Sequence, residues 1–232
     1  MKSHPILHKV VNAIHKVLAT EKIVLLAYID QNHIPYSVFR DRHFEMKNPI
    51  ELNLLVVGKS AGQYRAVTIE KIEQKCRHII PTTILLLSAE QFSHQVAIKS
   101  EFSASILGSD QLLYQATDAS TAATNESPAA STGIPASDLW YKRAGTFYQT
   151  AKAQQRLGEY GMAAFCLHQV AEQLLIFLIQ TAVGFKVGSH NLDRLLQHAR
   201  FYYQDAATVF TIQSGRKGPD KSTEEIIYTL PV

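Results

Sequence analysis

Cysteine is scarce in this sequence. Only Cys76 and Cys166 occur among 232 residues. Two cysteines do not indicate a disulfide framework or a cysteine-based zinc site, and they suit a reducing cytosol. Hydrophobic residues make up 46% of the chain, which is enough to build apolar cores, so the sequence predicts a globular cytoplasmic protein.

The sequence also lacks a large excess of charge of one sign, and it lacks a long apolar run. The formal net charge of +3 is too small to indicate a nucleic-acid partner by itself, and we expect no sequence-specific reader of DNA. Residues 1–18 carry charges throughout and lack the apolar centre of a signal peptide. The apolar stretch at 174–183 is shorter than the about 20 residues that span a membrane, so we expect no membrane partner.

Several catalytic and metal-binding motifs are also missing. The chain has no H-E-x-x-H sequence, and the Gly-Lys-Ser at 58–60 lacks the glycine-rich run of a phosphate-binding loop. His4, His8 and His15 fall near one helical face, but such sets are usually plain surface, so we predict no metal site. The basic loop at 40–47 can contact phosphate, although a solvated loop is the simpler interpretation.

One segment differs in composition from the rest of the chain. Residues 116–137 are rich in Ala, Ser and Thr and contain almost no large apolar side chain. Such a segment cannot bury enough surface to order itself, which predicts a flexible linker. A long surface loop within one domain is the alternative. The sequence therefore divides into a domain at 1–115 and a second domain at 138–232.

The first domain mixes helices with buried strands. Apolar residues at helical spacing predict helices at 4–19, 67–78 and 89–99. Compact β-type runs predict strands at 22–29, 51–57, 82–87 and, more briefly, 101–107. This alternation predicts an α/β domain, and the α+β class for the whole chain.

The second domain is predicted to be an up-and-down helical bundle. Ser137 or Asp138 caps a helix that ends near Gly158, and a long helix at 159–183 stops at Gly184. Ser189 caps the next helix. The helix that Ser189 caps covers 190–202. Short elements follow it, namely a helix at 205–212, a turn at 215–220 and a last helix that begins at Ser222 or Thr223. Long helices joined by short loops are typical of a bundle.

The long helix carries polar side chains inside an apolar sequence. Its predicted core seam steps by three and four residues and consists of Ala164, Leu167, Ala171, Leu174 and Leu178. His168 and Glu172 share a face, as do Gln169 and Gln173. Buried polar groups without partners cost about 1–3 kcal/mol each, so we expect partners across the bundle or across a dimer interface.

Residues 148–199 resemble the HEPN family (higher eukaryote and prokaryote nucleotide-binding domains). The first helix ends in GEY, the second carries HQVAEQLL within 167–175, and the third opens with HNLDRLL at 190–196. The resemblance implies a helical bundle that pairs with a second copy and binds a nucleotide or RNA. His168, Glu172 and His190 are the site residues that it implies.

HEPN domains often accompany a minimal nucleotidyltransferase, and residues 51–57, ELNLLVV, resemble the DIDLLVV strand of that fold. The match places Glu51 and Asn53 at the two acidic positions, which hold Mg²⁺ on nucleotide phosphates in active enzymes. Here one position is an amide, no Gly-Ser follows the strand at 22–29, and the later strand offers only Thr82 and Thr83 for a third acid. The resemblance therefore implies a degenerate nucleotidyltransferase-like domain, with Mg²⁺ as a cofactor only if the site is active.

Active HEPN ribonucleases resemble one another in an Arg followed four to six residues later by a His. Arg194 and His198 come closest to this arrangement, although a solvated helix face is the simpler interpretation. The leading hypothesis is a non-catalytic nucleotide- or RNA-binding protein, homodimeric through its bundle, of a toxin–antitoxin or defence kind. The alternatives are a nucleotidyltransferase that uses Glu51 with Asp30 or Asp41, and a ribonuclease that uses Arg194 and His198.

Overall fold

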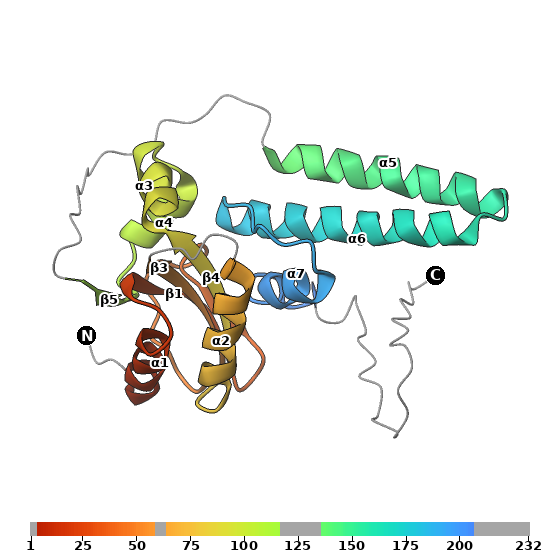
Figure 1. Cartoon of the computed structure of the whole chain (residues 1–232). Coiled ribbons are helices and arrows are strands. Elements are labelled where there is room, and N and C mark those ends of the chain that lie inside the picture. The colour runs from red at the N-terminus through yellow and green to blue at the C-terminus, as the bar shows by residue number, and fades with distance from the viewer. Residues whose placement is uncertain (1–3, 59–63, 117–135, 207–232) are drawn as a thin grey trace, which may run out of the picture.

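The computed structural model describes residues 4–58, 64–116 and 136–206 (Figure 1). Helix makes up 53% and strand 20%, and the strands form one mixed sheet. The predicted α+β class is therefore confirmed. The predicted elements beyond residue 206, namely most of the helix at 205–212, the turn at 215–220 and the last helix, lie outside the described residues.

The sheet is built around β1. Strand β1, Thr20–Asp30, pairs antiparallel with β2, Pro35–Ser37, with β3, Pro49–Gly58, and with β5, Leu112–Gln115. Strand β4, Thr82–Ser88, pairs parallel with β3, so the order is β2-β1-β3-β4. The predicted strands at 22–29, 51–57 and 82–87 are confirmed, and the short β2 and β5 were not predicted.

Helices α1, Pro5–His15, and α2, Arg65–Arg77, cover one face of the sheet (Figure 1). Side chains alternate between the faces of a strand, and Leu52, Leu54 and Val56 of β3 point to this side. They join a core cluster with apolar residues of both helices. The predicted helices at 4–19 and 67–78 are confirmed, the first with a shorter C-terminal end.

The other face of the sheet is covered by elements from both halves of the sequence. They are α3, Ala89–Ala97; α4, Glu101–Leu107; the C-terminal half of α6, Tyr160–Val183; and α7, Leu192–Ala199. Leu55 and Val57 of β3 share one cluster with Leu175 and Ile179 of α6. The sheet therefore buries its second face only with the help of residues after 160.

This shared core bears on the predicted linker. Most of the segment at 116–137 lies outside the described residues, and the domain boundaries at 115 and 138 stay a prediction. A linker that lets the first domain move freely does not fit a core cluster that contains both Leu55 of β3 and Leu175 of α6. Apolar burial of this kind is worth about 25 cal/mol per Å², so the two halves are held together.

Helices α5, Ala136–Arg156, and α6 form an antiparallel hairpin that extends beyond the sheet (Figure 1). Gly158 (φ 81°) makes the turn between them, and Gly184 (φ 68°) ends α6. Both backbones are left-handed, a conformation that glycine adopts without steric cost. The breaks predicted at Gly158 and Gly184 are confirmed.

The predicted strand at 101–107 is wrong, because this segment is helix α4. The alternation of Phe102, Ala104 and Ile106 fits a strand, but Phe102 and Ile106 are also one helical turn apart. The Ser100 hydroxyl accepts a hydrogen bond from the backbone N–H of Ser103, which caps a helix start. Similarly, α7 begins at Leu192 with Asn191 as its cap, whereas Ser189 was predicted.

The predicted core seam of α6 is also wrong. Leu167 and Ala164 are exposed, whereas Ala163 and Cys166 are buried in this part of the helix. In the second half the buried side includes Leu175 and Ile179. The buried face turns along the helix because α6 packs beside α5 first and against the sheet afterwards. No single seam therefore describes it.

Helix α6 also passes a test of length and composition for a membrane span. Its 24 residues include an 18-residue window of mean hydropathy 1.7, of which 39% is buried inside the protein. Among the described residues it is the one helix of this kind. The C-terminal half of α6 contributes to the core over the sheet, as a central helix of a protein interior does.

Candidate functional site

A cleft of about 820 Å³ opens between α5, α6 and the connection that leads to α7. Its size is in the range of ligand-binding pockets, about 300–1,000 Å³. Two cations and two large aromatic side chains are among the ten lining residues, which are Trp140, Arg143, Thr146, Phe147, His168, Gln169, Glu172, Gln173, Lys186 and His190.

Two cationic side chains, Arg143 and Lys186, pack against the ring of Trp140. The Arg143 guanidinium carbon lies 5.1 Å from the centre of the Trp140 ring, and Lys186 Nζ lies 4.3 Å from it. Both distances are in the range of cation–π attraction, about 6 Å or less. The indole N–H donates a hydrogen bond of 2.7 Å to Oε1 of Gln180, which fixes the ring against α6. Two positive charges are therefore held beside Trp140 in the lining of the cleft.

Glu172 and His190 contact each other across the cleft. Glu172 Oε1 lies 2.9 Å from His190 Nδ1, and the side chains are 6% and 82% exposed. A carboxylate buried to this extent needs a hydrogen-bond partner or an opposite charge. His190 supplies the contact from the water side. The only carboxylate among the lining residues is therefore already engaged.

Gln173 lies beside this pair and has an unused acceptor. Its Nε2 donates to Oε1 of Glu172 at 3.5 Å, whereas its Oε1 is buried without a hydrogen-bond partner. Buried polar atoms of this kind are uncommon in proteins. Gln173, a lining residue of the cleft, therefore carries an unsatisfied buried oxygen.

The structure brings His168, Glu172 and His190 into one cleft. The first two lie one turn apart on α6, and His190 precedes α7. Sequence reasoning missed Trp140, Arg143, Phe147 and Lys186 as lining residues. On α5 the spacing of 140, 143 and 147 places those side chains on one face, which is a readable signal, whereas no pattern marks Lys186.

Glu51 and Asn53, at the two positions where the nucleotidyltransferase resemblance expects acids, lie outside the cleft and are covered by other side chains. Oε1 of Glu51 accepts a hydrogen bond of 2.7 Å from Nη2 of Arg200. Asn53 is 0% exposed, and its Nδ2 donates to the Tyr202 hydroxyl at 3.3 Å while its Oδ1 has no partner. The segment after α7 thus closes over both residues. Glu51 and Asn53 do not share the cleft that contains His190.

Arg194 and His198 do not face a common opening. Arg194 donates through Nη2 and Nη1 to the two oxygens of Glu73, at 2.6 and 3.2 Å. His198 is 2% exposed, and burial, followed by the nearby Arg194 charge, lowers its pKa to about 3. An imidazole with such a pKa is neutral at physiological pH and has no contact with solvent.

The described residues contain no group of three or more His, Cys, Asp or Glu that holds a metal ion. His4 Nδ1 accepts from the backbone N–H of Ile6, and His15 Nδ1 lies 3.1 Å from Oγ1 of Thr20. These two histidines therefore make separate local contacts. Cys76 and Cys166 are both buried as free thiols.

Comparison with known proteins returned no match: no family model, curated protein or solved structure resembles the chain significantly.

Proposed function

We propose that this protein binds a nucleotide or RNA, without catalysing its turnover, through the cleft between α5 and α6. In this proposal residues 148–199 act as a HEPN-type bundle and residues 1–115 as a degenerate nucleotidyltransferase-like domain. A role in a toxin–antitoxin or defence system belongs to the same proposal. His168, Glu172 and His190 keep the site roles that the resemblance implies.

The arrangement of charge in the cleft is the observation that carries the proposal. Arg143 and Lys186 stand over the Trp140 ring with their charged ends available to an anion. Glu172 contacts His190, and within the described residues it forms no ion pair with either cation. Guanidinium and ammonium groups are the usual partners of phosphate. Phe147 adds an aromatic surface on which a base can stack.

The contacts of the expected catalytic groups support a binding role. Glu51 is engaged by Arg200, and Arg194 by Glu73. A carboxylate that holds Mg²⁺ needs open coordination positions around the ion, and an Arg that stabilises a phosphate needs a free guanidinium. Here both groups serve as links between the two halves of the chain.

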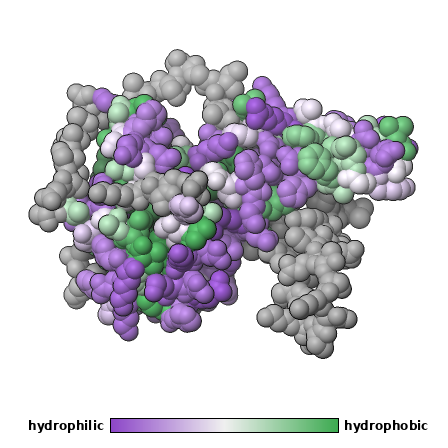
Figure 2. Space-filling view, viewed as in Figure 1, coloured by the Kyte–Doolittle hydropathy of each residue, from purple (hydrophilic) through white to green (hydrophobic). Residues whose placement is uncertain are grey.

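We also propose that the protein is a homodimer through the helical hairpin. Hydrophobic side chains gather over the far end of α5 and α6 (Figure 2). Leu157, Met162 and Phe165 are exposed there, Phe165 by 57%. Exposed apolar patches of this kind often mark an interface. A second copy fits because a two-fold contact brings the same patch of both copies together.

The single tryptophan of the chain offers a direct test of the cleft. Trp140 touches both cations, so a phosphate that draws them away changes its fluorescence. We expect ATP, GTP or a single-stranded RNA to alter the emission of the purified protein in a saturable way. The double variant Arg143→Gln/Lys186→Gln should bind at least about tenfold more weakly, since each lost charged contact is worth about 1.5–3 kcal/mol.

A matched control removes two exposed positive charges elsewhere, with Lys47→Gln/Lys71→Gln. This variant should bind like the unchanged protein. Equal losses in both double variants would show that net charge, and not the cleft, is responsible. No saturable change with any of the three ligands would refute the proposed function.

A further inference from the structure

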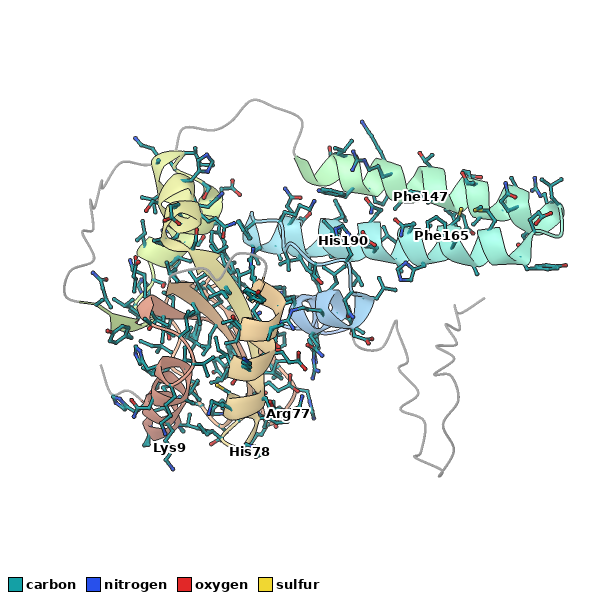
Figure 3. All side chains as sticks on the ribbon, viewed as in Figure 1. Lys9, Arg77, His78, Phe147, Phe165 and His190 are labelled. Atoms are coloured by element: carbon teal, nitrogen blue, oxygen red, sulfur yellow. The ribbon has the colours of Figure 1, made fainter. Side chains whose placement is uncertain are left out.

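A second hollow, of about 460 Å³, lies between α1 and α2 at the opposite side of the sheet from α7. Figure 3 shows Lys9 on α1 and His78 after α2 at the same end of the molecule. The groove formed by this hollow is lined by Lys9, Asn12, Ala13, Lys16, Lys75, His78 and Ile79. We call it the basic groove.

Three lysines converge on the basic groove from two helices. Lys9 and Lys16 are seven residues apart, which is two helical turns, so they share a face of α1. Lys75 comes from the last turn of α2. No carboxylate occurs among the lining residues, and within the described chain none of these lysines forms an ion pair.

The helix dipole does not account for this arrangement. Cations are favoured near the C-terminal end of a helix, which explains Lys16 and Lys75. Lys9 is the fifth of the eleven residues of α1 and lies outside its last turn, so the dipole does not favour its charge. Helix α1 contains no acidic residue that offsets it. The like charges therefore repel one another in the absence of an anion.

We propose that the basic groove is a binding site for the phosphate groups of a nucleic-acid backbone. The three ammonium groups and the Asn12 amide surround a concave surface, so several of them can reach successive phosphates. Lysines act as point charges toward phosphate and tolerate changes of sequence and register. This proposal stands on the α1–α2 geometry and does not depend on the cleft between α5 and α6.

The lining of the groove favours a polynucleotide over a membrane surface. Proteins that lie on membranes combine basic residues with large apolar side chains that enter the lipid. Here Ala13 is buried and Ile79 is half-buried, and the lining has no exposed large apolar side chain. A single phosphate does not use three separated lysines, whereas a strand with regularly spaced phosphates does.

Binding of a labelled oligouridine of about 16 nucleotides, a length that covers one typical single-strand site, tests the proposal by fluorescence anisotropy. The groove variant Lys9→Gln/Lys16→Gln/Lys75→Gln should bind at least about tenfold more weakly at low salt. Each phosphate contact contributes about 0.7 to the slope of log K against log salt, so the slope should fall by about 2.

The control variant Lys47→Gln/Lys142→Gln/Lys152→Gln removes the same charge from exposed positions outside both hollows. The cleft variant Arg143→Gln/Lys186→Gln shows whether the α5–α6 site contributes separately, so failure of one site does not hide the other. Support requires a loss in the groove variant that the control variant does not share, in protein of unchanged thermal stability.

Three outcomes would overturn the inference. Equal affinity and equal salt slope in the groove and control variants would show that the lysines act only through net charge. Pyrophosphate that displaces the oligomer at equal phosphate concentration would assign the groove to small anions. Retention on anionic phospholipid vesicles, without binding of the oligomer, would assign it to a membrane surface.

Discussion

Arg200 donates a hydrogen bond of 2.7 Å to Glu51, a residue that precedes it by 149 positions. Tyr202 contacts Asn53, two residues further along β3. The two side chains at which a nucleotidyltransferase resemblance places metal-binding acids thus hold the segment after α7 against the sheet. Stability measurements can examine how much these two contacts contribute to the fold.

Removal of Glu51 should destabilise the protein. The Glu51 and Arg200 side chains are only 23% and 32% exposed, so Glu51→Ala leaves a half-buried guanidinium without its partner. We expect the free energy of unfolding to fall by about 1–2 kcal/mol, and a double-mutant cycle with Arg200→Ala to show coupling. Urea denaturation measures both quantities.

The control for that pair is Glu45→Ala, which breaks an exposed contact with Lys47 and should change stability by less than about 0.5 kcal/mol. If Glu51→Ala is as stable as the unchanged protein but abolishes a Mg²⁺-dependent nucleotidyl transfer, the enzyme alternative is right and the structural role is wrong.

Replacement of a buried polar pair by apolar groups should be tolerated or stabilising. Oδ1 of Asn53 is buried without a partner, and its Nδ2 bond to Tyr202 is long at 3.3 Å. Asn53→Leu/Tyr202→Phe removes the unsatisfied oxygen together with both partners of the bond, so we expect a gain of about 1 kcal/mol. Asn53→Asp instead buries a charge, so we expect it to lower the urea midpoint. A midpoint for Asn53→Asp above that of the unchanged protein would contradict this argument.

Acid should destabilise the protein through His198. Burial lowers the pKa of His198 from 6.5 to about 3, so the folded state keeps it neutral while the unfolded state takes up a proton below pH 6.5. Stability is therefore fully present above pH 6.5 and declines toward pH 3, by about 1.4 kcal/mol per pH unit from this group. His198→Leu should flatten that decline in urea denaturation. The exposed His94→Gln serves as control, and a decline of unchanged slope in His198→Leu would rule out this residue as the cause.

Two glycines should respond to alanine in opposite directions. A Cβ at Gly184 sits in a left-handed backbone and lies 3.3 Å from Cβ of Glu101 and from N of Phe102. We expect Gly184→Ala to cost about 1–2 kcal/mol. Gly145, within α5, has nothing within 4 Å of the added carbon, so Gly145→Ala should gain about 0.5–1 kcal/mol from helix propensity. Thermal melts report the two signs, and equal shifts would contradict the geometry.

The dimer proposal can be checked by light scattering. We expect a mass of two chains for the unchanged protein and of one chain for Phe165→Glu, because a charge at an apolar interface disfavours association. Phe177 is the informative comparison, since its ring lies 5.4 Å from that of Tyr141 within the same chain. Phe177→Glu should lower the melting temperature of the protein, because it places a charge within the chain's own packing and not at the interface. A single-chain mass for the unchanged protein at tens of micromolar would refute the dimer.

Local chemistry explains what the sequence could predict. Strands β1, β3 and β4 are short apolar runs with β-branched or bulky side chains, and their burial is nearly complete. Gly158 and Gly184 mark the ends of α5 and α6, because no neighbouring residue adopts those backbone angles at low cost. Such signals lie within a few residues of the feature that they define.

The rest depends on contacts between distant segments. The pattern of 101–107 fits both a strand and a helix, and the Ser100 cap decides in favour of the helix. The turning of the buried face of α6 follows from where α5 ends and the sheet begins. In the cleft, His168 and Glu172 were linked by helical spacing, whereas Lys186 joins Trp140 only through the fold. Periodicity within one element carries no information of that kind.

The cluster that contains both Leu55 and Leu175 also determines when the protein can fold during its synthesis. When β1 to β5 have left the ribosome, the sheet still lacks the cover that α6 and α7 provide. At about 5–20 residues per second, translation of those helices takes several seconds more. Throughout that interval the nascent chain exposes the apolar face of the sheet, and chaperones bind surfaces of this kind. A truncation after β5 should therefore aggregate instead of accumulating as a smaller folded protein.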